Sequence, residues 1–323
     1  MLIKVHGPVP ESPRSKTLFD GRMENMTITY YNELALFLQS IDMSTKILTV
    51  TYSPPNGDSK SLKISLEPDI ADLEVVDVSL HRSSAEAYRM SEEVNAWFSS
   101  CFGYEVILAY LGPNKRPVLG NISPNAVKPK PAGSQTWLSS ITASMPGISA
   151  SKSIDEGIMF ADCAAYLVVT EESLQDVSSR LSDGTKVDTT KFRPNIVLSG
   201  SSKAYEEDYW GAITVSGCSQ KENKQEIEIV LTANCLRCVS VNVDYSTGQP
   251  AKGEAGTVLK KLMKDRRVDN GNKYSPVFGR YGFLTSSAAG QTIAVGDEVS
   301  VSKINRERTI FGRSFKVSMV FQC

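Results

Sequence analysis

Short runs of alternating apolar and polar residues recur along this chain and constrain its fold more than any other feature. In the first part of the chain they occupy 26–31, 34–41, 46–52, 62–66 and 74–80. A period of two is typical of strands with one buried face. Turn signals such as the Pro-Pro-Asn-Gly sequence at 54–57 separate the runs. We therefore expect residues 1–122 to form a small antiparallel β subdomain.

One helix is predicted to interrupt these strands. It starts at Ser91-Glu92-Glu93, where a serine cap and early acids suit a helix N-terminus. Its apolar stripe is formed by Val94, Trp97, Phe98 and Phe102. These four side chains are predicted to belong to the core of the first subdomain.

The rest of the chain interleaves strands with helices. Strands are predicted at 226–231, 238–243, 277–284 and 293–301, and helices at 170–181 and 255–266. This pattern predicts that 151–323 is a mixed α/β, strand-rich module that closes as a β-barrel with peripheral helices. Between the two parts, 123–150 is predicted to be a linker or strap, because its beginning is rich in proline and lysine. A length of 323 residues suits two subdomains.

Composition excludes some classes of function. A net charge of −1 and a pI near 6.2 give no general attraction for nucleic acid. Six cysteines are too few for a disulfide scaffold in a chain of this length, which favours a reducing compartment. No apolar run approaches the length of a membrane span. The chain as given is therefore expected in the cytoplasm.

A Cys-x-x-Cys pair gives the first chemical signal, in Thr-Ala-Asn-Cys-Leu-Arg-Cys at 232–238. The positive charge of Arg237 favours the thiolate of Cys238, and thiolate binds soft metals. Zinc needs four ligands, and a second cysteine pair is absent. A redox pair would start a helix, whereas 238–243 is predicted to be a strand. A buried, inert pair remains the alternative to a metal ligand.

Further motifs accompany this pair in a fixed order. They are Phe-Ala-Asp-Cys-Ala-Ala-Tyr at 160–166, Lys-Phe-Arg-Pro-Asn at 191–195, Glu-Asp-Tyr-Trp at 207–210, Asp-Tyr-Ser-Thr-Gly at 244–248, and the segments 274–281 and 293–299. In order and spacing the series resembles the MOSC domain. The similarity is greater to the amidoxime-reducing components of mitochondria. Several separated motifs that agree in order are more specific than one short pattern.

The resemblance implies a role for particular residues. Cys238 would ligate molybdenum held by a pterin, with Arg193 and Asn195 on the pterin and Asp162 near the metal. Asn234, Cys235 and Arg237 are further cofactor-binding candidates in the same segment. The chemistry is reasonable, since a thiolate is a soft donor and a carboxylate can move protons. The alternatives are a solvated turn set by Pro194 for Arg193 and Asn195, and a helix cap before 170–172 for Asp162.

The function implied is reduction of N-hydroxylated compounds, such as amidoximes and hydroxylamines, by a molybdenum-cofactor-dependent oxidoreductase. Electrons would come from a b-type cytochrome and its NADH-dependent flavoprotein reductase. The alternatives are a non-catalytic or degenerate cofactor-binding or carrier protein, and a sulfur carrier of the sulfurase type.

The resemblance also concerns residues that would precede Met1. Relatives carry an upstream cofactor-phosphate-binding segment that this sequence does not contain, so the first subdomain is expected to be truncated. An upstream anchor, as in relatives, would add a mitochondrial association.

Overall fold

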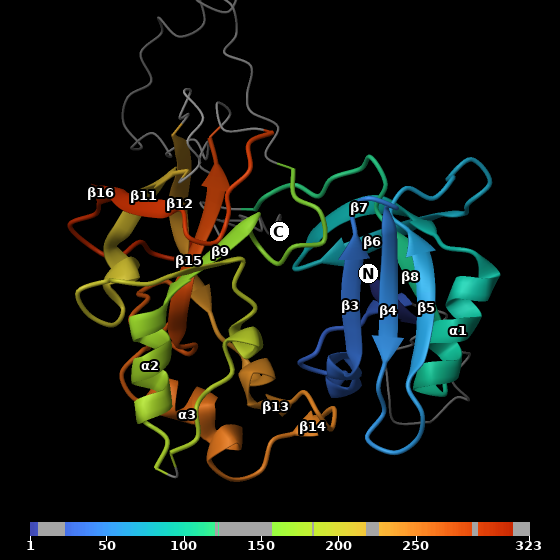
Figure 1. Ribbon diagram of the computed structural model, residues 1–323, viewed down its shortest axis with the longest axis horizontal. Coiled ribbons are helices and arrows are strands. Elements are labelled where there is room, and N and C mark those ends of the chain that lie inside the picture. Colours follow the sequence, from blue (N-terminus) through green and yellow to red (C-terminus); the bar gives the residue numbers. More distant parts are fainter. Residues whose placement is uncertain are drawn as a thin grey trace, which may run out of the picture.

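The computed structural model describes residues 1–5, 23–119, 122, 157–182, 184–217, 226–285 and 290–312. These residues form two strand-rich lobes that lie side by side (Figure 1). The N-terminal lobe carries the blue to cyan segments and the C-terminal lobe the green to red ones. The predicted linker or strap, 123–150, lies outside the described residues. The domain limits 1–122 and 151–323 stay predictions.

The N-terminal lobe contains two antiparallel sheets. One has the strand order β2-β1-β8-β7-β6, and the other has the order β3-β4-β5. The strands are β1 (Leu2–Val5), β2 (Met23–Asn25), β3 (Phe37–Asp42), β4 (Ile47–Tyr52), β5 (Lys60–Ser65), β6 (Val75–Leu80), β7 (Ser83–Arg89) and β8 (Val106–Tyr110). The alternation of burial along β6 explains why it was predictable: Val76, Val78 and Leu80 face the core.

Helix α1 (Glu92–Phe102) lies on the outer side of this lobe (Figure 1). It begins after Ser91 as predicted, although the Ser91 side chain makes no capping hydrogen bond. It ends at Gly103, whose φ of 77° is left-handed and suits glycine. Val94 and Phe98 are buried, while Trp97 and Phe102 pack against the same core from partly exposed positions.

The C-terminal lobe contains a six-stranded sheet that curls into a barrel-like shape (Figure 1). Its order is β10-β9-β15-β12-β11-β16, with β9 and β10 parallel and the other pairs antiparallel. The strands are β9 (Tyr166–Thr170), β10 (Ile196–Leu198), β11 (Trp210–Ser216), β12 (Ile227–Leu236), β15 (Val277–Leu284) and β16 (Glu298–Ile304). The predicted strand-rich, barrel-like class is confirmed.

Two α-helices pack beside this sheet, α2 (Glu171–Ser179) and α3 (Val258–Met263). Thr170 caps α2 by accepting a hydrogen bond from the backbone of Ser173. Short 3₁₀ helices and one small hairpin complete the lobe: η5 (Thr189–Phe192), η6 (Glu206–Tyr209), η7 (Val239–Asn242), η8 (Gly253–Thr257), β13 (Val243–Asp244) and β14 (Gln249–Pro250). Within the described part of the chain, no helix is long and apolar enough to cross a membrane.

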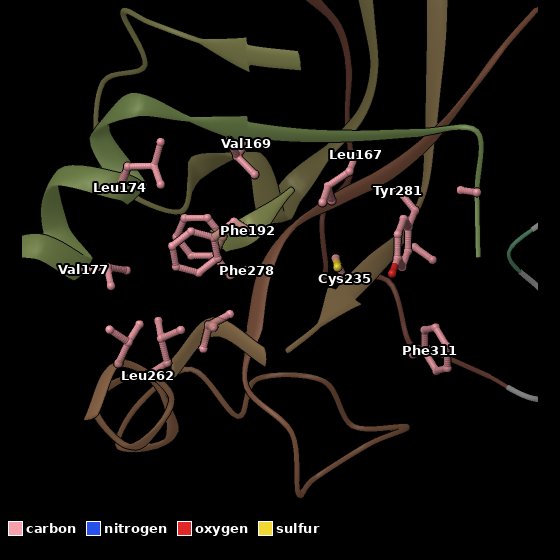
Figure 2. Packing of buried hydrophobic residues seen from close by; sticks show 14 of the residues in the cluster. Leu167, Val169, Leu174, Val177, Phe192, Cys235, Leu262, Phe278, Tyr281 and Phe311 are labelled. Atoms are coloured by element: carbon pink, nitrogen blue, oxygen red, sulfur yellow. The ribbon is translucent and has the colours of Figure 1, made fainter. Parts of the chain in front are cut away.

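A stacked aromatic pair anchors the core of this lobe (Figure 2). The rings of Phe192 and Phe278 lie 4.1 Å apart between centroids. Cys235 and Tyr281 belong to the same apolar cluster, together with residues of α2 and α3. This packing holds the segments 191–195 and 235–238 against one another, and both carry predicted site residues.

Several predicted elements are wrong in whole or in part, for local reasons. The segment 26–31 forms no strand and contains a turn, while in 34–41 the 3₁₀ helix η1 (Asn32–Leu36) delays the predicted strand, β3, until Phe37. The helix predicted at 255–266 is shortened to α3, because η8 takes its first turn. In 293–301, a turn closed by Ala294 N–H donating to Asp297 Oδ2 delays strand β16 until Glu298.

The predicted strand at 238–243 is also wrong, because these residues form η7. Val241 and Val243 are buried, yet Val239 is 47% exposed, so the three valines do not share one face of a strand. The actual strand, β12, lies upstream, and the Cys-x-x-Cys pair sits at its C-terminal end.

Candidate functional site

Cys238 lies where the chain leaves β12, and its side chain is exposed. The Thr29 and Ser240 hydroxyl oxygens lie 3.2 and 3.1 Å from Sγ, in position to donate to a thiolate. Partial burial opposes ionisation, but these hydrogen bonds and the Arg237 charge outweigh it, so the pKa of Cys238 is lowered. Cys238 is therefore an accessible thiol with raised thiolate character.

Cys235 differs from Cys238 in its exposure and in its pKa. It is 3% exposed and lies in the core beside Tyr281 (Figure 2). Burial raises the pKa of this thiol. The inert alternative therefore describes Cys235 but not Cys238. Although η7 does follow the pair, the burial of Cys235 leaves Cys238 as the accessible thiol of the two, which disfavours a redox couple.

Arg237 lies against the aromatic pair, and its positive charge acts on both thiols. Its guanidinium donates to the carbonyl oxygens of Phe278, at 2.7 and 2.9 Å, and Phe192, at 2.8 Å. It also lies over both rings, 5.3 and 5.6 Å from their centroids. Because these contacts occupy the guanidinium of Arg237, its action on a bound group would be electrostatic. Its hydrogen bond to Phe192 also holds in place the residue that precedes Arg193.

Arg193 follows η5 with a left-handed backbone, φ 52°, which is unfavourable for a side chain with a Cβ. Its side chain is 58% exposed, and its guanidinium lies 3.8 Å from Asp162 Oδ2. Asn195 is anchored by Oδ1, which accepts from the Leu167 backbone at 2.8 Å. Arg193 ends the short helix η5, and its side chain lies close to Asp162.

Asp162 is placed between two lobes. Its Oδ1 lies 3.5 Å from Nε2 of His81, on the N-terminal lobe. The hydrogen bond from His81 lowers the pKa of Asp162 against the effect of burial, and the charge of Arg193 lowers it further. The alternative of a helix cap is wrong, since Thr170 caps α2. We refer to His81, Asp162, Arg193, Arg237 and Cys238 as the rim cluster.

Sequence reasoning missed the two contributions of the N-terminal lobe, His81 and Thr29. Thr29 lies 209 positions before Cys238, and no local pattern signals the contact. His81 follows the predicted strand at 74–80, and no local pattern signals its contact with Asp162. A third contact joins the lobes where Gly248 packs against Leu36, without room for a Cβ.

Asn234, a predicted cofactor-binding residue, is not brought to the rim cluster. It is fully buried, and its amide donates to Asp269, at 2.7 Å, and to the Thr309 carbonyl. Its oxygen accepts from Arg280 at 2.5 Å. We refer to Asp208, Asn234, Arg266, Asp269 and Arg280 as the buried polar network. Asp208 pairs with Arg266 through two hydrogen bonds of 2.8 and 2.9 Å.

Part of this chain is similar to a known protein family. The family model for the MOSC domain matches residues 155–300. These residues form a MOSC domain. The rim cluster thus combines three groups inside the MOSC match region, Asp162, Arg193 and the Arg237–Cys238 pair, with His81 from outside it.

Named relatives are similar to part of this chain. Mitochondrial amidoxime-reducing component 1 of Homo sapiens is 34% identical over 146 residues, 44% of this chain and 38% of that protein. Mitochondrial amidoxime reducing component 2 of Rattus norvegicus is 33% identical over 38% of this chain and 33% of its own length. Molybdenum cofactor sulfurase of Oryza sativa subsp. japonica is 27% identical over 62% of this chain and 21% of its own length. The match therefore spans less than two fifths of each of these relatives.

Proposed function

We propose that this protein reduces N-hydroxylated compounds, such as amidoximes and hydroxylamines, with a pterin-bound molybdenum that Cys238 ligates. The proposal rests mainly on Cys238. Its thiol is exposed, it lies where the two lobes meet, and its pKa is lowered. Relatives named as amidoxime-reducing components support the reaction type.

The residues of the rim cluster fit such a cofactor. A thiolate supplies the soft donor that molybdenum prefers. The exposed guanidinium of Arg193 suits a phosphate or a pterin ring oxygen, because its planar donors form paired hydrogen bonds. Asn195 uses its oxygen for the backbone, so its amide N–H groups are proposed to face the pterin. When bound, the cofactor would supply two-electron chemistry.

The reaction itself needs protons as well as electrons. Reducing R–NH–OH to R–NH₂ and water consumes two electrons and two protons, and breaks the N–O bond. Electrons are proposed to come from an external b-type cytochrome and its NADH-dependent flavoprotein reductase. Asp162 is proposed to take part in proton handling at the rim cluster.

The proposal extends to cellular location. The relatives named above include proteins called mitochondrial, and we propose a mitochondrial association on that basis. The cytoplasmic location expected from the sequence stays the competing prediction. Fractionation of cells that express the tagged chain distinguishes the two.

The first test is the molybdenum and pterin content of the chain, purified from a host that makes the cofactor. We expect near-stoichiometric molybdenum in the wild-type protein and none in Cys238→Ala. Cys235→Ala is the matched control: it should keep its molybdenum, because Cys235 lies in the core. Full molybdenum content and benzamidoxime reduction in Cys238→Ala would refute the ligand assignment.

A second candidate is a protein that carries the cofactor or a sulfur atom on Cys238 without reducing a substrate. The sulfurase of Oryza sativa favours it, since its match covers a larger share of this chain, 62%, than that of the human amidoxime-reducing component, 44%. Persulfide on Cys238 in the purified chain, found by mass spectrometry, without reduction of benzamidoxime by the molybdenum-loaded protein, would favour this candidate.

A further inference from the structure

We propose that His81, which the N-terminal lobe contributes, is the proton donor of this site, and that Asp162 and Arg116 are the residues that position it. The inference rests on the proposed function, because it assigns the source of a proton that N-hydroxyl reduction consumes.

His81 sits on an unusual turn. Strands β6 and β7 pair up to Leu80 and Ser83, so His81 and Arg82 alone form the loop. Both have left-handed backbones, with φ of 53° and 68°. Two-residue hairpin loops of this kind usually contain asparagine and glycine, because a Cβ is unfavourable there. Such strain persists where the surrounding structure imposes it, and it concentrates at functional sites.

Arg116 connects this turn to the loop that carries Asp162. Its side chain is 1% exposed, and its guanidinium donates to the carbonyl oxygen of Leu80 at 2.9 Å, directly before His81. It also donates to the carbonyl oxygens of Met159 at 3.0 Å, of Asp162 at 3.3 Å, and of Ala161. One buried side chain therefore holds both lobes in the arrangement that brings His81 to Asp162.

A small, open pocket lies at this junction, with His81, Arg116, Asp162 and Cys163 among its lining residues. An N-hydroxyl group that enters this pocket would meet both His81 and Asp162. The pocket draws residues from both lobes, so it forms only when the lobes are packed together.

The charges around His81 and Asp162 indicate which of the two donates the proton and which stays ionised. Asp162 faces His81 through Oδ1 and Arg193 through Oδ2, and the charge of Arg237 also favours its ionised form. A carboxylate held ionised is a poor proton donor at neutral pH. Histidine is the side chain whose charge changes between pH 5 and 8.

Four groups therefore surround the pair: Arg193 and Arg237 act on Asp162, the buried guanidinium of Arg116 lies behind it, and the thiol of Cys163 lines the pocket. On the turn itself, Arg82 is exposed. Asp162 thus orients the imidazole of His81 and stays ionised.

The N–O bond of R–NH–OH breaks, two electrons arrive from the external haem protein, and the oxygen leaves as water. His81 gives one proton to the departing oxygen, and solvent supplies the other. Since its side chain is 39% exposed, His81 regains its proton directly from water.

The first measurement uses the cofactor-free protein. Aspartate labelled with ¹³C reports the carboxyl titration of Asp162 by NMR. We expect His81→Gly to raise the pKa of Asp162 toward its usual value, and His81→Asn to raise it less, because the amide still donates a hydrogen bond. Both residues tolerate a left-handed backbone, so the turn should persist. An unchanged pKa of Asp162 in His81→Gly overturns the pairing.

The second measurement follows benzamidoxime reduction by the molybdenum-loaded protein, with reduced methyl viologen as electron donor. His81→Asn should lower kcat on the order of a hundredfold, and its pH profile should differ from that of the wild-type protein. Arg82→Gly, in the same turn, is the control and should keep the wild-type rate and pH profile.

The outcomes separate the two ideas. If the wild-type protein turns over and His81→Asn keeps its rate and pH profile, the role of His81 is wrong while the proposed function stands. If the molybdenum-loaded wild-type protein does not turn over, the proposed function and the proton-donor role both fail, and the Asp162 titration alone decides whether the pair exists.

Discussion

The buried polar network and the rim cluster both contain charged residues of the C-terminal lobe, but they satisfy those charges in opposite ways. In the network, Asp208 is fully buried and bound by two arginines, Arg266 and Arg308. In the rim cluster, Asp162 is 44% exposed and faces His81 and Arg193 at 3.5 and 3.8 Å. The hydrogen bonds of Asp208 are short, whereas the contacts of Asp162 are long and its partners His81 and Arg193 have left-handed backbones.

This difference between the two clusters separates residues that stabilise the fold from residues that are available to a ligand. Buried charges that are paired and hydrogen-bonded hold a structure together, and removing one partner is costly. Exposed side chains on left-handed backbones stabilise little and remain available to a ligand. Asn234 and Cys238 are four residues apart along one segment, yet they belong to different clusters.

The largest expected effect comes from breaking the network. Asp208→Asn should lower the free energy of unfolding by about 3 to 5 kcal/mol, because it leaves Arg266 with an uncompensated buried charge. Urea denaturation measures the change. Asp162→Asn, at the rim cluster, is the control and should change stability by about 0.5 kcal/mol or less. Equal losses in the two variants would erase the distinction between the clusters.

A smaller effect is expected for Asn234, where the sequence predicted a cofactor contact. Asn234→Ala should destabilise the fold by about 1 to 3 kcal/mol, because Asp269 and Arg280 lose a buried partner. The molybdenum content of the molecules that fold should stay at the wild-type value. Elemental analysis of the folded fraction checks this, and a clear loss of molybdenum there would return Asn234 to the list of cofactor contacts.

The smallest effect concerns the two thiols in the cofactor-free protein. Because the pKa of Cys238 is lowered and that of Cys235 is raised, iodoacetamide should modify Cys238 at a lower pH than an ordinary thiol. The rate of Cys238 modification rises with pH until the thiolate is fully formed. Ser240→Ala should shift this rise to higher pH, since it removes a hydrogen bond to the thiolate. Mass spectrometry identifies the modified cysteine, and early labelling of Cys235 would contradict the assignment.

Parts of the fold were predictable because short-range patterns determine them. The strands at 46–52, 74–80 and 277–284 match β4, β6 and β15 closely, since alternation or continuous burial follows directly from the pleat. The start of α2 was predictable from a threonine followed by two glutamates. The strand at 238–243 was not, because buried valines pack equally well from a 3₁₀ turn.

The sequence by itself determined the chemistry that this protein carries: a thiol beside an arginine, an arginine and an asparagine around a proline, and an aspartate in a short motif. The tertiary structure decided which of these groups meet. It buried Cys235 and left Cys238 exposed, and it turned Asn234 into a core residue. It also brought Thr29 and His81 across from the other lobe. The physical reason is that burial and electrostatic environment depend on contacts between segments far apart in the chain, which no local pattern encodes.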